Sequence, residues 1–139
     1  MKRAILAFVA AALGWVLVVS LIDRGLRIFL EGYAVAEPDM AFTLGMMVAR
    51  LVMAAVASLI AGAIAAAIAP ASTRVPWLLG ALLLVLFLLS HVMLWSRFPV
   101  WYHLTFLLTL VPLVVLGSYL WRALAAPRLR VSRRAAPTP

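Results

Sequence analysis

Five side chains in or beside the apolar segments of this sequence have types that could support acid–base, ion-pair or metal chemistry: Asp23, Arg50, Ser90, His91 and His103. Counted at about 1.5 Å per helical residue from the far ends of those segments, Asp23, Arg50 and His103 reach the same level, with Ser90 and His91 deeper. Polar groups in apolar surroundings need partners. The sequence therefore predicts a polar cluster whose main contact is an Asp23–Arg50 ion pair.

This cluster allows a functional and a structural interpretation. Ionisable groups inside apolar helices are candidates for a proton or ion relay, in which His91 or His103 would titrate. A relay needs polar groups along a whole path, and no acid occupies the centre of an apolar segment. We therefore favour a structural network that fixes the register of the helices.

No cofactor, metal site or enzymatic activity is predicted. The two histidines, His91 and His103, differ in level by about four residues, or about 6 Å, which argues against a haem iron between them. Met46 and Met53 share a helix face, but methionine in an apolar helix usually packs rather than binding copper. Ser90 and His91 point about 100° apart on a helix, so they do not form a nucleophile and base.

The elements that position these residues are four long apolar segments. Hydrophobic residues make up 68% of the chain and charged residues 12%, unlike a soluble domain. A membrane-spanning helix needs about 20 apolar residues. Segments of about this length fall at residues 4–22, 42–69, 77–96 and 100–121. The sequence therefore predicts an all-α integral membrane protein, with residues 1–121 forming a four-helix bundle.

The distribution of charge predicts the orientation of these spans. One side of the predicted membrane has only basic residues: Lys2, Arg3, Arg74, Arg122, Arg128, Arg130, Arg133 and Arg134. The other side has three arginines and all four acids: Arg24, Arg27, Arg97, Asp23, Glu31, Glu37 and Asp39. Basic residues flanking spans stay in the cytoplasm. We therefore expect both termini in the cytoplasm and a multi-pass protein of the inner (cytoplasmic) membrane.

The first span allows two interpretations. A basic start, an apolar run and the small residues Ala34 and Ala36 fit a cleaved signal peptide. A cleavage site should follow the apolar run closely, and a charged stretch separates the two here, so we favour a retained signal anchor. Pairs of opposite charge four residues apart, Asp23–Arg27 and Arg27–Glu31, predict that this helix extends to about Gly32.

The second span is uncertain in extent because of Arg50. A start near Met40 would place Arg50 inside the bilayer, whereas a start at Leu51 would make it the outer boundary. The level count favours the boundary, opposite Asp23.

Small residues on the second span predict how the helices pack. They recur every four residues, at Ala54, Ser58, Gly62 and Ala66. Such a stripe lets two helix backbones approach closely, so this span is expected to be central in the bundle. Homodimerisation through the same stripe is the alternative. In the fourth span, Pro112 predicts a kink.

Residues 122–139 form a basic tail with little apolar content, for which we expect disorder or contact with a lipid surface. Its arginines would bind anionic lipids, or act only in setting the topology. No aromatic residues alternate with them, so binding of nucleic acid is not predicted.

The stretch Trp95-Ser96-Arg97-Phe98-Pro99-Val100-Trp101-Tyr102-His103, followed by Pro112 and Gly117, resembles small uncharacterised four-span bacterial inner-membrane proteins. The resemblance covers mainly the last two spans and implies no activity. Small multidrug transporters are similar in size, but they depend on an acid in the middle of their first span, and residues 4–22 contain none.

Two functions remain for the chain. The first is a non-enzymatic structural or accessory subunit with a membrane-protein partner, because four spans carry almost no soluble mass. The alternative is a small oligomeric transporter or channel that uses the outer polar cluster. An enzyme acting on lipid would need a cavity beside Arg50 and the histidines.

Overall fold

The computed structural model describes the backbone of residues 2–134 and the side chains of residues 2–125. Over these residues the secondary structure is helical, without strands. The helices are α1 (Lys2–Phe29), α2 (Tyr33–Ala36), α3 (Leu44–Ile68), α4 (Arg74–Met93) and α5 (Val100–Arg134). Four of them are long and apolar enough to cross a membrane, namely all except α2. The predicted all-α class and the number of candidate spans are thus confirmed.

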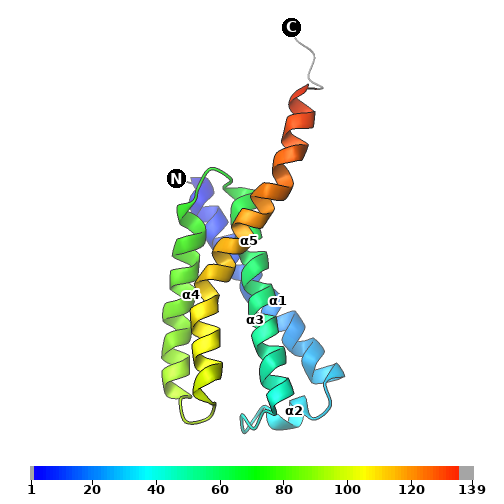
Figure 1. Ribbon diagram of the computed structural model, residues 1–139, viewed down its shortest axis with the longest axis vertical. Helices are drawn as coiled ribbons and strands as arrows, with labels where there is room; N and C mark the ends of the chain where they lie inside the picture. The colour runs from blue at the N-terminus through cyan, green and yellow to red at the C-terminus, as the bar shows by residue number, and fades with distance from the viewer. Residues whose placement is uncertain (1, 135–139) are drawn as a thin grey trace.

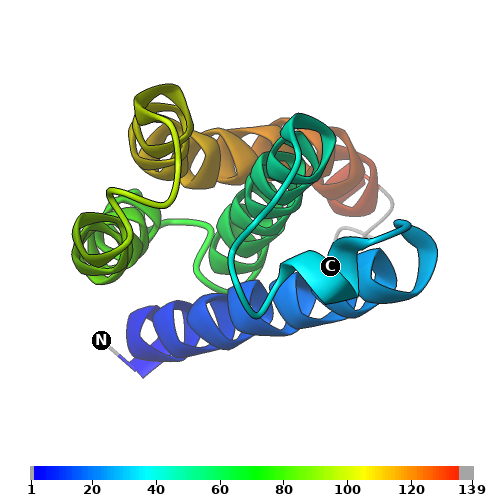
Figure 2. The same ribbon diagram turned by 90° about the horizontal axis from the view of Figure 1, so that it is seen from below.

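The four long helices run up and down in turn, with the start of α1 and the α3–α4 loop at one end (Figure 1). We call this the basic end, because Lys2, Arg3, Arg74 and Arg122 lie there. The other end carries α2 and the α4–α5 loop, and we call it the α2 end. Viewed along the bundle, α3 lies between α1 and α5, and α4 lies beside α5 (Figure 2). The second span is therefore the central helix, as predicted.

The small residues of α3 allow its backbone to touch that of α5. Ala54, Ser58, Gly62 and Ala66 are all buried. A Cβ added to Gly62 would collide with the carbonyl oxygen of Val114, and one added to Gly117 would collide with that of Leu59. The stripe is thus used within the chain, where side chains larger than glycine would hold the helices apart.

The α3 helix begins two residues after the predicted start of the second span at residue 42. Its first residue is Leu44, and the side chain of Thr43 caps it by accepting a hydrogen bond from the Met46 amide. Arg50 therefore lies in the second turn of α3, so the helix begins before it and not at Leu51. The level of Arg50 opposite Asp23 is the one that the count along the spans predicted. Threonine is a favoured N-cap residue, and its place before Leu44 fixes where the helix begins.

The remaining boundaries differ in detail. The α1 helix ends at Phe29, and Gly32 follows with a φ of 76°, close to the predicted end. The α4 helix ends at Met93, three residues before the predicted limit. The apolar part of α5 changes direction near its middle (Figure 1), as expected for a helix that contains Pro112.

The α5 helix does not stop at the end of the apolar segment. It continues to Arg134, so residues 122–134 are helical where disorder was expected. Apart from Pro127, residues 122–134 are mainly alanine, leucine and arginine, which are good helix formers and can extend an existing helix. The prediction for residues 135–139 lies outside the described residues.

Candidate functional site

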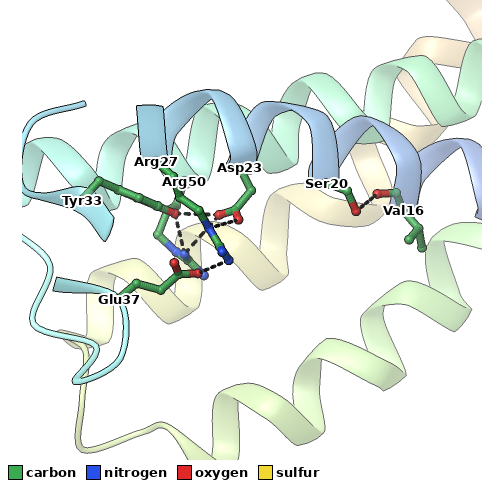
Figure 3. Close-up of polar contacts among 7 residues, drawn as sticks. All are labelled: Val16, Ser20, Asp23, Arg27, Tyr33, Glu37 and Arg50. Carbon is green, nitrogen blue, oxygen red and sulfur yellow. Dashed lines mark hydrogen bonds and ion pairs between the residues drawn. The ribbon is translucent and has the colours of Figure 1, made fainter. Parts of the chain in front are cut away.

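A polar network at the α2 end joins α1, α2 and α3 (Figure 3). The hydroxyl of Tyr33 donates a hydrogen bond of 3.0 Å to Oδ1 of Asp23 and accepts one of 2.7 Å from Nη1 of Arg50. The charged atoms of Asp23 and Arg50 lie 4.0 Å apart. The structure thus brings the predicted ion pair together, but at the limit of direct contact and with Tyr33 bridging it.

Arg27 extends the network toward solvent. Its Nε lies 3.0 Å from Oδ2 of Asp23, and its Nη2 lies 2.8 Å from Oε1 of Glu37. The first of these contacts was predicted, but Arg27 pairs with Glu37 instead of Glu31. The left-handed turn at Gly32 reverses the chain, which brings Glu37 back over the end of α1. Two arginines and two acids meet here, so their formal charges cancel.

Tyr33 is the member of this network that the sequence analysis missed. Its side chain is fully buried although it follows a turn, and burial, the largest influence, raises the pKa of its phenol to about 12. A phenol that stays neutral can donate to a carboxylate and accept from a guanidinium at once. The sequence signal that could have indicated this role is the position of Tyr33, directly after Gly32 and between the charged ends of two helices.

A second polar group joins α4 to α5. The Nδ1 atoms of His91 and His103 are 2.7 Å apart, and both rings are buried. One ring must donate the proton and the other accept it. Trp95 stacks on His103 with ring centroids 4.6 Å apart. At this separation the two nitrogens share a hydrogen, because a metal bridging them at about 2.0–2.1 Å from each would need more room.

The two histidines are at one level, so the predicted offset between them was wrong. His91 lies two residues before the end of α4, and His103 lies three residues after the start of α5. Counting from the shared loop therefore places them opposite each other. Counting from the far ends failed because it began at Trp77, whereas α4 begins at Arg74 and Arg122 of α5 lies against Ser72.

The predicted cluster of five residues is thus two groups with a cavity between them. Asp23 and Arg50 belong to the Tyr33 network, and the histidines form their own pair. The Ser90 hydroxyl only donates within α4, to the carbonyl of Leu86 at 3.4 Å. Arg50, Ser90 and His91 nevertheless line a common cavity of about 230 Å³.

Below this level, a third polar contact crosses the core. The indole of Trp15 donates a hydrogen bond of 3.2 Å to the Ser58 hydroxyl, which itself donates to the carbonyl of Ala54 at 2.7 Å. Trp15 therefore packs against another helix. Ser58 is thus the one polar side chain of the small-residue stripe of α3, and its hydroxyl both accepts and donates a hydrogen bond.

At the basic end, Arg122 links α5 to the α3–α4 loop. Its Nη2 donates a hydrogen bond of 2.7 Å to the carbonyl oxygen of Ser72 in the α3–α4 loop. One of the basic residues assigned to topology thus also fixes a loop.

Comparison with known proteins gives no match to a family model, to a curated protein or to a solved structure. The fold and the site define a class only: an all-helical chain with four helices apolar and long enough to cross a membrane. A function has to be inferred from the residues of the site themselves.

Proposed function

We propose that the chain is a four-span protein of the cytoplasmic membrane that acts as a non-enzymatic structural or accessory subunit. The observation that carries this proposal is the closed network at the α2 end. Its two arginines and two acids are joined to one another and to a neutral phenol, Tyr33. Charges that pair with each other in this way hold α1, α2 and α3 in register.

The orientation belongs to the same proposal. Lys2, Arg3, Arg74 and Arg122 gather at the basic end, whereas Asp23 and Glu37 lie at the α2 end. Basic residues are retained on the cytoplasmic side, so the α2 end would face outward. The arginines of the α5 extension would then lie in the cytoplasm, where they would be available to anionic lipids.

The packing of the middle of the bundle favours this role over transport. Residues 4–22, 51–73, 75–90 and 104–121 contain no ionisable side chain except Tyr119, near the basic end. The contact of α3 with α5 at Gly62 and Gly117 brings backbone against backbone. A hydrophilic path through one copy of the chain would have to open this contact.

The outer surface of the helices offers an apolar face to lipid or to a partner helix. On α4, Leu89 is 67% exposed and Leu79 is fully buried. This pair gives a test, since a photo-crosslinking residue can be placed at either position.

The experiment combines crosslinking in intact cells with the mass of the complex purified in mild detergent. An accessory subunit gives a mass larger than one copy, and crosslinks from Leu89 and other exposed positions but none from Leu79. A chain that runs as a monomer without crosslinks from any exposed position contradicts the proposal. So does ion or proton flux into liposomes that disappears in Arg50→Gln, because that result assigns the chain to transport.

A further inference from the structure

The cavity at the α2 end, which lies between the Tyr33 network and the histidine pair, has a volume of about 230 Å³. This volume far exceeds the roughly 10–15 Å³ that one water molecule requires. Met40 and Phe98, from the α2–α3 and α4–α5 loops, belong to its lining. The cavity can therefore take up a group much larger than water from the level of these loops.

The walls of this cavity are largely aromatic and offer no free charge. Four aromatic side chains line it: Phe87, Phe98, Tyr102 and Phe106. The one charged residue among the described lining residues is Arg50, whose guanidinium is already hydrogen-bonded to Tyr33 and lies 4.0 Å from Asp23. A charged ligand would find no unpaired counter-charge here, which makes its burial costly. The cavity is therefore suited to a neutral molecule with a flat ring, which aromatic side chains pack well.

The histidine pair supplies a polar contact to this cavity. The Nδ1 atoms of His91 and His103 bind each other at 2.7 Å, so only the Nε2 atoms are left for other partners. Nε2 of His103 is buried without a hydrogen-bond partner among the described residues, whereas Nε2 of His91 is not enclosed in this way. Because His91 also lines the cavity, its Nε2 is the nitrogen of the pair that a molecule in the cavity can reach.

The enclosed nitrogen of His103 indicates which tautomer each ring adopts. A buried N–H without a partner is rarer in proteins than a buried acceptor without one, so Nε2 of His103 is the nitrogen without a hydrogen. His103 then carries its hydrogen on Nδ1 and donates it to Nδ1 of His91. A neutral His91 ring must carry its own hydrogen on Nε2. His91 is thus a donor, and the matching group on a ligand is an acceptor such as a carbonyl oxygen.

The donor is also held in place before any ligand arrives. The His91 ring packs against the ring of Phe106, with centroids 4.6 Å apart. Its partner His103 stacks on Trp95, also at 4.6 Å. A donor held in this way loses little freedom on binding.

We propose that this cavity binds a neutral planar molecule of the quinone type, an apolar ring that carries carbonyl oxygens. Nε2 of His91 donates a hydrogen bond to one carbonyl oxygen, and the four aromatic side chains cover the ring. His103 is a positioning residue, because its hydrogen bond fixes the tautomer of His91. Apolar molecules of this type partition into a membrane, from which they can enter a cavity near the helix ends. The site is independent of the accessory role proposed above.

The test is a titration of the delipidated full chain in detergent micelles with menadione, a flat naphthoquinone. The chain contains no cysteine with which menadione could react. The control compound is 2-methylnaphthalene, which has the same ring and methyl group without the carbonyl oxygens. Equilibrium dialysis against protein-free micelles measures binding, and infrared spectroscopy follows the carbonyl stretch of the bound menadione.

The variants separate the donor from the shape of the cavity. His91→Phe keeps a ring but removes the donor, and Ser90→Leu narrows the cavity without touching the histidines. Ser20→Leu is the matched control, because Ser20 is an exposed serine of α1 that bonds only within its own helix.

The expected result is one menadione bound per chain, with its carbonyl stretch at lower frequency than in protein-free micelles. His91→Phe should lower the affinity about fivefold or more, as for loss of one hydrogen bond, and should abolish the frequency shift. Ser90→Leu should also weaken binding, and Ser20→Leu should not change it. The control compound should bind the wild type about fivefold or more weaker than menadione does.

The proposal is overturned if menadione does not bind stoichiometrically, or if 2-methylnaphthalene binds the wild type as tightly as menadione does. It is also overturned if His91→Phe folds and keeps either the affinity or the carbonyl shift of the wild type. Should His91→Phe show no melting transition, Ser90→Leu decides: weaker binding supports the site, and unchanged binding contradicts it.

Discussion

The two halves of this bundle associate by different means. Toward the basic end, α3 and α5 meet through glycines, and their backbones are in contact at Gly62 and Gly117. Toward the α2 end, the helices are joined by side chains: the Tyr33 network links α1 to α3, and the histidine pair links α4 to α5.

This difference has a consequence for what each half can do. Backbone contact leaves no space and fixes the helices by shape, because small residues are the only ones that fit. Side-chain contact keeps the helices further apart, and a cavity of about 230 Å³ remains beside Arg50. One half is thus suited to rigidity, and the other has room for a ligand.

The largest effect is expected from a methyl group placed in the backbone contact. In Gly62→Ala the new Cβ meets the Val114 carbonyl, which cannot move without the helix, so we expect a loss of about 3 kcal/mol in the free energy of unfolding. Gly45→Ala is the matched control in the same helix, because nothing lies near that position. It should be neutral or stabilising by up to about 1 kcal/mol. Unfolding in mixed micelles measures both, and equal effects would contradict the close contact.

The next effect concerns the network of the other half. Tyr33→Phe removes the hydroxyl that serves Asp23 and Arg50, and we expect destabilisation of about 2 kcal/mol from two hydrogen bonds lost in a partly buried site. Tyr119→Phe, at an exposed tyrosine of α5, should change stability by less than about 0.5 kcal/mol. If the two substitutions had the same effect, the bridge would not contribute to stability.

A smaller effect is expected from removing the polar contact inside the small-residue stripe of α3. Ser58→Ala leaves the Trp15 indole without its acceptor, so about 1 kcal/mol should be lost. Ser20→Ala is the control, because that exposed hydroxyl bonds only to Val16 in its own helix. A double-mutant cycle of Ser58→Ala with Trp15→Phe should show coupling. Additive effects would mean that the hydrogen bond adds nothing.

The last effect is a dependence on alkaline pH. The Tyr33 pKa rises from 10.0 to about 12 on folding, so the unfolded chain releases this proton first as pH increases. The stabilisation is complete below pH 10 and is lost between pH 10 and about 12. The difference in melting temperature between the wild type and Tyr33→Phe should therefore narrow over that range. A difference that stays constant would show that the phenol does not ionise late.

The two halves also differ in how much of their structure the sequence predicts. The close-packed half was predictable in part, since small residues every four positions in an apolar helix indicate close contact with another helix, and Gly62 lies where that pattern places it. The pattern did not tell a helix of the same chain from one of a second copy. The level of Asp23 and Arg50 was also predictable from helix rise alone.

The contacts at the α2 end could not be predicted from residue spacing and helix rise. Tyr33 enters the network only because Gly32 turns the chain back, and a left-handed turn is not encoded in hydropathy. The histidine pair depends on where α4 stops, which a cap or a loop decides. Side-chain networks across loops follow from tertiary geometry, which periodicity does not contain.

The two ends of the bundle are proposed to face opposite sides of a membrane, and this orientation can be measured directly. The chain contains no cysteine, so a single introduced thiol reports one position. Asp39→Cys lies in the exposed loop at the α2 end, and Thr73→Cys lies in the α3–α4 loop at the basic end. In intact cells a membrane-impermeant maleimide should label Asp39→Cys, and should label Thr73→Cys only after the membrane is opened. Labelling of both from outside, or of Thr73→Cys alone, would contradict the account.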